Sequence, residues 1–191
     1  MVTCKACDLV YVNPRLTMEA LAGLYNDQVI SYAHYYVKTA PEDARSFAKR
    51  LDLIERHLSV SGSVPQAGTR RLLELGCGPG TFMQVARERG WSVRGIDVNA
   101  EAVAHCHAAG LDVVTGTFPH AAFEGQRFEV AVMSDFIEHV TDPRAVLAAT
   151  RAHLVADGLL FLTTPDVGSP LARAAGPRWP HLKPLEHLTY F

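Results

Sequence analysis

Apolar positions along the chain follow two kinds of spacing. Between Phe47 and Leu58 they recur every three or four residues, which predicts a helix with one apolar face, starting near Pro41. Beyond residue 70, short apolar runs alternate with helical spacing. The expected strands are 70–75, 92–96, 112–115, 128–133 and 158–163, and the expected helices are 81–89, 99–109 and 143–154. This alternation is typical of a parallel sheet flanked by helices, so we expect an α/β fold.

The two ends of the chain lack this alternation. We interpret residues 1–40 as an N-terminal appendage, with a short helix over 17–24 that its first residue caps. Residues 41–164 then form the α/β core, and residues 165–191 form an irregular tail. The strand 158–163 is apolar throughout and only irregular sequence follows it. Its bare edge would favour association, for example with a second copy of the chain.

Composition narrows the class of protein. A chain of 191 residues that is 48% hydrophobic and 20% charged suits one globular domain. A formal net charge of -2 gives no basic excess, which argues against nucleic acid or an anionic membrane as a partner. No apolar run approaches the roughly 20 residues that cross a bilayer, and the start lacks the apolar stretch of a secretion signal. We therefore expect a cytoplasmic protein whose four cysteines are thiols or ligands rather than disulfides.

A glycine-rich turn follows the first strand of the core. Gly76, Gly78 and Gly80 stand at alternate positions, directly before the helix that begins near Thr81. Glycines let the backbone turn sharply and leave no side chain between its amides and a ligand, and a helix N-terminus adds partial positive charge. The turn could therefore hold a carboxylate or a nucleoside, although tight glycine turns without a ligand are also common.

An acidic residue ends the second strand. Asp97 follows Gly95 and Ile96, at the edge of the sheet where open parallel sheets bind ligands. Its two carboxylate oxygens can accept hydrogen bonds from both hydroxyls of a ribose. Asp97 could instead cap the next helix, but Asn99 is placed to do so itself.

Glu74–Gly80 and Gly95–Asp97 together resemble the first two motifs of the class I S-adenosylmethionine-dependent methyltransferases, and the resemblance covers about residues 70–164. It implies a Rossmann-like fold in which the glycine turn holds the methionine part of the cofactor and Asp97 holds the ribose. The implied cofactor-binding residues are Glu74, Gly76, Cys77, Gly78, Gly80, Asp97, Val98, Thr117, Phe118 and Ser134. Thr117 and Phe118 match the adenine-contacting stretch, where the family usually has an acidic residue instead of Thr117. Family members carry two further strands, so the resemblance also implies that the last strands are missing.

Ionisable residues follow the fourth strand. Asp135 and His139 lie at the carboxyl end of this strand, beside the glycine turn, and we take them as the catalytic residues. His139 could accept a proton from the methyl acceptor while Asp135 orients it; alternatively, His139 is bonded to backbone at a helix end. Asp135, Glu138 and His139 are also similar to a cation-binding set of ubiquinone-pathway methyltransferases, with the shorter aspartate in first position. We assign no metal, because these groups could equally be solvated.

Both ends carry further candidates. Cys4 and Cys7, with the sequence that follows, resemble the second half of a small zinc ribbon that precedes some bacterial methyltransferase domains. The other Cys-x-x-Cys pair that a four-ligand zinc site needs is absent from the sequence. Residues of the tail could line the acceptor side or simply pack on the surface, namely Trp179, His181, Glu186, His187 and Tyr190.

The function expected from the resemblance is methyl transfer from S-adenosylmethionine to a small-molecule acceptor, with O-methylation favoured by analogy. Two alternatives stay open. A nicotinamide-dependent oxidoreductase also has Gly76-x-Gly78 followed by an acidic residue about twenty positions later, but it should carry glycine at position 81, where this chain has Thr81. A non-catalytic S-adenosylmethionine-binding module is the other.

Overall fold

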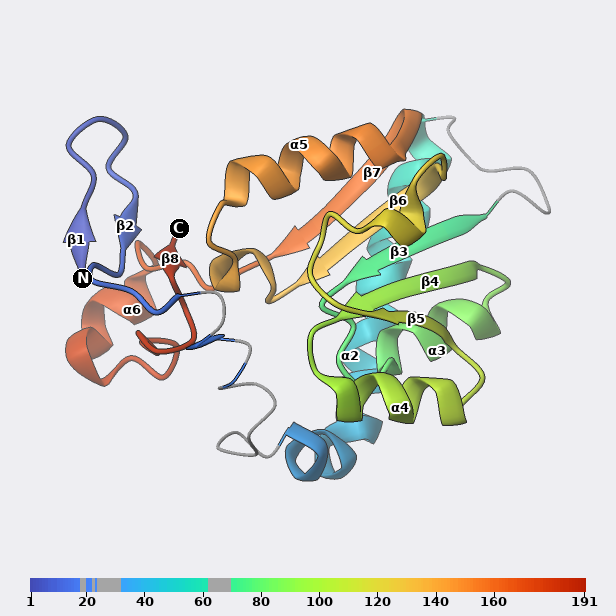
Figure 1. Cartoon of the computed structure of the whole chain (residues 1–191), viewed down its shortest axis with the longest axis horizontal. Helices are drawn as coiled ribbons and strands as arrows, with labels where there is room; N and C mark the ends of the chain where they lie inside the picture. Colours follow the sequence, from blue (N-terminus) through green and yellow to red (C-terminus); the bar gives the residue numbers. More distant parts are fainter. Residues whose placement is uncertain (18–19, 22, 24–31, 62–69) are drawn as a thin grey trace.

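The computed structural model describes residues 1–17, 20, 21, 23, 32–61 and 70–191. Its core is a five-stranded sheet in the order β5-β4-β3-β6-β7, and every neighbouring pair of strands is parallel (Figure 1). The strands are β3 (Arg71–Leu75), β4 (Ser92–Asp97), β5 (Asp112–Thr115), β6 (Phe128–Ser134) and β7 (Leu154–Thr163). The helices around it are α2 (Tyr32–Ser61), α3 (Thr81–Glu88), α4 (Ala100–Ala108) and α5 (Pro143–His153). The α/β fold predicted from the alternation is confirmed.

Alternate residues of the central strand β3 serve the two faces of the sheet. Leu72 packs with apolar residues of α2 and α3, including Leu51 and Phe82. Leu73 points to the other face, into the cluster that includes Val146 of α5. The strand is buried on both sides, as expected for the middle of a parallel sheet covered by helices, and its carboxyl end meets the glycine turn.

Helix α2 is longer than the sequence predicts. The spacing of apolar residues predicts a start near Pro41, whereas the helix begins at Tyr32 and continues through the proline. Proline lacks a backbone N–H, so it normally occupies a first turn, but it can remain inside a helix at the loss of one hydrogen bond. The apolar stripe becomes visible only at Phe47, and this is why the extra turns could not be read from the pattern.

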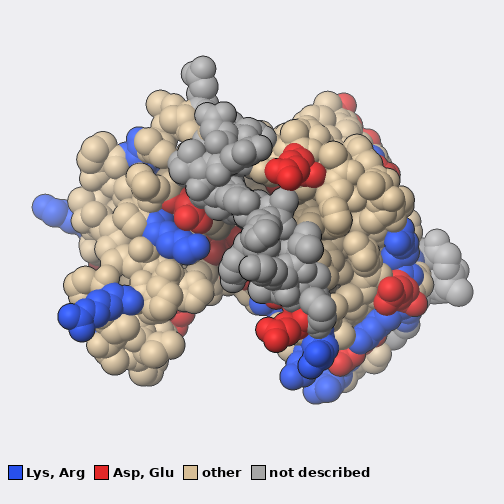
Figure 2. Space-filling view, turned by 90° about the horizontal axis from the view of Figure 1, so that it is seen from below, with Lys and Arg blue, Asp and Glu red and all other residues tan. Residues whose placement is uncertain are grey.

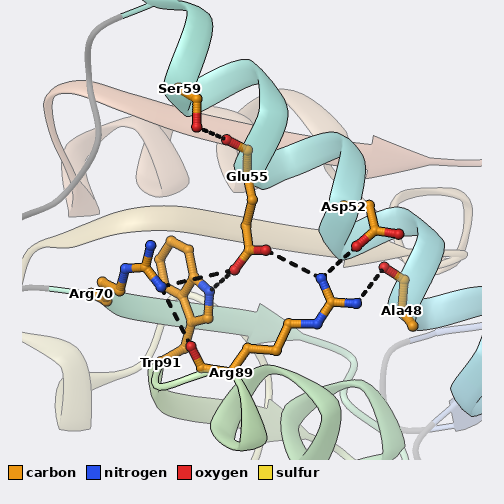
Figure 3. Close-up of polar contacts among 7 residues, drawn as sticks. All are labelled: Ala48, Asp52, Glu55, Ser59, Arg70, Arg89 and Trp91. Atoms are coloured by element: carbon orange, nitrogen blue, oxygen red, sulfur yellow. Dashed lines mark hydrogen bonds and ion pairs between the residues drawn. The ribbon is translucent and has the colours of Figure 1, made fainter.

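A polar network fixes α2 on the core (Figure 3). Glu55 of α2 accepts hydrogen bonds from the indole of Trp91 at 3.0 Å and from Arg89 at 3.2 Å, and Arg89 also pairs with Asp52. The guanidinium of Arg70 lies 5.5 Å from the Trp91 ring centroid. Glu55 is partly buried and has two donors, so the network fixes how α2 is placed against the end of α3 and the start of β4.

The two ends of the chain form a second, antiparallel sheet. Its strands are β1 (Val2–Thr3), β2 (Val10–Tyr11) and β8 (Thr189–Tyr190), in the order β1-β2-β8. The tail also contains a short helix, α6 (Pro170–Ala175), and is therefore not irregular as predicted. Trp179, Tyr190 and Val10 share one apolar cluster. The predicted helix over 17–24 lies largely outside the described residues, but Thr17 caps its start by accepting a hydrogen bond from the amide of Ala20 at 3.2 Å.

Charge on the surface is mixed. Over the described part of the face in Figure 2, lysine and arginine side chains are interspersed with aspartate and glutamate. None of the described helices combines the length and apolar character needed to cross a membrane.

Candidate functional site

The glycine turn joins β3 to α3, and two of its glycines are required by close packing. Gly76 has φ 71°, and a Cβ there would lie 2.5 Å from the ring of Phe136. Gly80 has φ 78°, and a Cβ there would meet the side chains of Leu111 and Cys106 at 2.5 and 2.9 Å. Both positions combine a left-handed backbone with no room for a side chain, so only glycine fits.

Gly78, between them, is different. It also has positive φ, 50°, but no described atom beyond its chain neighbours lies within 4 Å of the position that a Cβ would take. Its amide donates a hydrogen bond of 2.8 Å to Oδ2 of Asp97, whose Oδ1 accepts from the amide of Asn99. Burial raises the pKa of Asp97, and these amide hydrogen bonds oppose the rise. Asn99 itself caps α4, as expected, through Ala102. Asp97 and the open part of the turn at Gly78 are therefore in direct contact.

Glu74 is buried beneath this turn. It is 3% exposed, and its Oε2 has no hydrogen-bond partner among the described residues. Burial raises the pKa of Glu74 well above its usual range; Cys106 and Asp97 add to the rise, and Arg50 opposes it. A buried carboxyl oxygen without a partner is costly, so a donor or a cation from a ligand would stabilise it.

Arg50 is a site residue that the sequence reasoning missed. It lies on α2, and its guanidinium donates to the hydroxyl of Thr163, at the carboxyl end of β7, over 3.3 Å. The signal was present, because a cation at position 50 falls on the apolar stripe, three residues after Phe47 and four before Ile54. It supplies positive charge close to Glu74.

The three remaining residues that the resemblance implies on the cofactor's nucleoside side lie beyond β4 and β5. Val98 is half-buried and Thr117 is exposed. Phe118 is buried in the core, where its ring contacts those of Phe123 and His153. The Phe118 ring therefore packs in the core, and the contact of the stretch Thr117 and Phe118 with adenine stays a prediction.

The end of β6 reaches from the glycine turn toward the tail. Ser134 has a buried hydroxyl without a partner among the described residues, and Asp135 is exposed with φ 50°. A left-handed backbone is unfavourable for a residue other than glycine, and such strain often marks a functional site. Phe136 then packs on Gly76. The predicted catalytic segment is thus in direct contact with the predicted cofactor turn.

The next residues form a cluster with the tail. Glu138 is 1% exposed; its Oε2 accepts from the Thr164 hydroxyl at 3.0 Å, and its Oε1 has no partner in the described part of the chain. Burial raises the pKa of Glu138 to about 7, and Asp135 adds to the rise. His139 Nδ1 donates to the carbonyl of Glu186 at 3.0 Å. Burial, together with His187, lowers the pKa of His139 to about 4, so its imidazole is neutral at neutral pH.

Residues 33–191 match the model of a protein family described as a methyltransferase domain. The chain belongs to this methyltransferase family. Among curated proteins, the ubiquinone biosynthesis O-methyltransferase of Azoarcus sp. (strain BH72) is 30% identical over 122 residues, which are 60% of this chain and 49% of that protein. That of Cereibacter sphaeroides (strain ATCC 17025 / ATH 2.4.3) is 35% identical over 127 residues, 60% of this chain and 51% of the relative. The methyltransferase chain thus spans about half the length of these curated relatives.

Solved structures show the same fold. An S-adenosylmethionine-dependent methyltransferase from Clostridium acetobutylicum ATCC 824 has a TM-score of 0.58 at 16% identity, covering 76% of this chain and 61% of that one. The plantazolicin methyltransferase BpumL in complex with SAH has a TM-score of 0.62 at 12% identity, covering 88% and 65%. The Rossmann-like class I fold inferred from the motifs is therefore confirmed for this methyltransferase domain.

Two groups of side chains in the chain have metal-ligand chemistry. Glu138, His139 and His187 each offer one ligand atom, and these atoms lie within 4.8 Å of one another. This spacing suits a divalent cation, and equally a substrate group that hydrogen-bonds to all three. This set differs from the three residues that resemble the cation-binding set in the sequence, Asp135, Glu138 and His139, because His187 takes the place of Asp135. Cys4 and Cys7 lie on the hairpin that joins β1 to β2, and no second cysteine pair adjoins them in the described residues.

Proposed function

We propose that this methyltransferase domain binds S-adenosylmethionine at the glycine turn and transfers its methyl group to a small-molecule acceptor, with O-methylation favoured. The observation that carries the proposal is the hydrogen bond between Gly78 and Asp97 on an uncovered turn. The names of the curated relatives, which are O-methyltransferases, support the choice of atom. The unpartnered carboxyl of Glu74 beneath the turn supports a cationic ligand.

The residues present fit the charges of the cofactor. Glu74 and the turn Gly76–Gly80 would hold its methionine part, where Glu74 suits the ammonium group and Arg50 suits the carboxylate. Asp97 would hold the ribose hydroxyls beside Val98, and Ser134 would bind from the end of β6. Thr117 and Phe118 stay as the adenine-side candidates. When bound, the cofactor supplies an electrophilic methyl group on a sulfonium.

The acceptor would lie beside Asp135 and His139, which we propose as the catalytic residues. Because Nδ1 of His139 carries the proton donated to Glu186, its Nε2 carries a lone pair. The bound cofactor would supply the methyl group, with the methyl–sulfur bond breaking and its electron pair returning to sulfur as the acceptor oxygen takes the methyl. Nε2 of His139 would take the proton of the acceptor hydroxyl. A neutral imidazole with a low pKa is a weak base, so proton transfer would accompany methyl transfer rather than precede it. Asp135 would orient the acceptor.

Calorimetric titration of the purified protein with S-adenosylmethionine, S-adenosylhomocysteine and nicotinamide cofactors tests the proposal. We expect micromolar to millimolar binding of the first two and none of the others; binding of a nicotinamide cofactor alone would overturn it. Transfer of a labelled methyl group to a metabolite extract separates an enzyme from a non-catalytic binding module. The cytoplasmic location, the lack of a nucleic-acid partner and a homo-oligomer formed through the β7 edge stay predictions from the sequence.

A further inference from the structure

We propose that His187, contributed by the C-terminal tail, binds the methyl acceptor by accepting a hydrogen bond from its hydroxyl group, beside His139. The inference rests on the proposed function for the nature of the ligand. It adds to the acceptor site a residue of the tail, far in sequence from Asp135 and His139. Its structural content, the placement of protons on two imidazoles, can be measured on the protein alone.

Backbone contacts on both sides of His187 bring it to the site. The carbonyl of Glu186 accepts the Nδ1 hydrogen bond of His139, and the amide of Leu188 donates to the carbonyl of Glu138 at 2.7 Å. The residue between them is consequently held against this segment. Its ring lies edge-on to that of His139, with centroids 4.7 Å apart and planes at 88°.

The two imidazoles carry their protons on different nitrogens. His139 donates through Nδ1, so the lone pair is on Nε2. The backbone of His181 raises the pKa of His187, as a carbonyl that accepts from the ring would, whereas Nδ1 of His187 is buried without a partner among the residues that the structure describes. The donating nitrogen is therefore Nε2, and Nδ1 carries the lone pair. A buried histidine with a purely structural role would have both ring nitrogens satisfied.

The acceptor nitrogen of His187 favours a hydroxyl donor over an anion. Burial, Lys183 and the charge of His181 together lower the pKa of His187 to about 4, against its backbone interaction with His181 and the charge of Asp135, so the ring is neutral at neutral pH. Glu138 presents an unpartnered carboxyl oxygen to the same cluster. The lone pair on Nδ1 of His187 accepts a hydrogen bond from an O–H group, whereas a carboxylate has no donor to offer it.

Heteronuclear NMR of the imidazole nitrogens in chelator-treated protein tests this directly. At neutral pH we expect Nδ1 of His139 and Nε2 of His187 to be protonated and the other two nitrogens unprotonated. Phenol, used as a hydroxyl probe, should shift the resonance of Nδ1 of His187, whereas anisole, its methyl ether, should not. A protonated Nδ1 on His187, or no response of that nitrogen to phenol, would overturn the inference.

Substitution separates His187 from general effects on the fold. His187→Phe keeps a ring of similar size but removes the lone pair, and we expect phenol to bind about tenfold more weakly. His153→Phe is the matched control, because Nδ1 of His153 bonds within α5 to the carbonyl of Ala149. Equal weakening in both variants would count against the role. Titration with S-adenosylhomocysteine runs in parallel. If the protein binds S-adenosylhomocysteine but does not respond to phenol, the proposed function stands and this inference is removed. If it responds to phenol but does not bind S-adenosylhomocysteine, the cofactor proposal is removed and the hydroxyl-binding role of His187 remains.

Discussion

The carboxylate of Asp97 accepts a hydrogen bond of 2.8 Å from the amide of Gly78, which joins the end of β4 to the glycine turn after β3. The proposed ribose-binding group and the proposed methionine-binding turn are thus one unit before any ligand binds. Oδ1 of the same carboxylate holds the start of α4 through Asn99. A change at Asp97 should therefore affect both parts of the cofactor.

Removing the carboxylate should weaken cofactor binding. For Asp97→Ala we expect a loss of about 1–3 kcal/mol in the binding free energy of S-adenosylhomocysteine, since charge-assisted hydrogen bonds to the ribose are lost. Calorimetry measures this loss of affinity. Asp112→Ala serves as the control, because Asp112, at the start of the outer strand β5, is exposed and its carboxylate pairs with Arg94 of β4. Unchanged affinity in Asp97→Ala would argue against the ribose role.

Gly78 and Gly125 form a matched pair. Both have positive φ and no described atom within 4 Å of a Cβ position, so Gly→Ala should cost each about 1 kcal/mol of folding stability. Only Gly78→Ala should abolish cofactor binding, because its methyl group would lie where the turn faces the ligand. Thermal unfolding and calorimetry on both variants check this; equal affinity in the two would place the ligand elsewhere.

Gly80 should matter for stability instead. Gly80→Ala would push a methyl group against Leu111 and Cys106, and we expect a loss of about 2–4 kcal/mol in the free energy of unfolding, more than for Gly125→Ala. Denaturant unfolding measures the difference. A loss no larger than that of the control would show that α3 and α4 can move apart.

Arg50 should contribute to cofactor affinity although it lies outside the glycine motifs. Arg50→Ala should weaken S-adenosylhomocysteine binding about tenfold, because the carboxylate of the ligand loses its cationic partner. Arg50→Lys should recover part of the loss. Arg56→Ala, an exposed arginine on the same helix, serves as control. Normal affinity in Arg50→Ala would remove it from the site.

Glu138 should make stability depend on pH in a defined direction. Its pKa is about 7 in the fold against 4.5 ordinarily, so the folded state binds its proton more tightly, and this contribution of about 3 kcal/mol is lost as pH rises from 4.5 through 7. Glu138→Gln should flatten that part of the curve. Denaturant unfolding of chelator-treated protein at several pH values measures it; an unchanged slope would contradict the burial of the carboxyl.

The α/β core could be predicted because its signals are local. The first strand, expected at 70–75, is observed at Arg71–Leu75, and the helix expected at 143–154 is observed at Pro143–His153. Apolar spacing and the capping residue Asn99 are contained in a few consecutive positions. The glycine turn and Asp97 could also be placed together, because each follows the carboxyl end of a strand, and parallel strands have their carboxyl ends at the same edge of the sheet.

Tertiary structure alone decided which distant residues share the site. Nothing near His187 in the sequence indicates that it meets His139, and the pairing of β2 with β8 joins two segments from opposite ends of the chain. The contact of the Phe118 ring with His153 likewise joins segments that are distant in the sequence. Short patterns specify helices, strands and turns, whereas contacts between remote segments depend on the packing of the whole chain, which no window of the sequence contains.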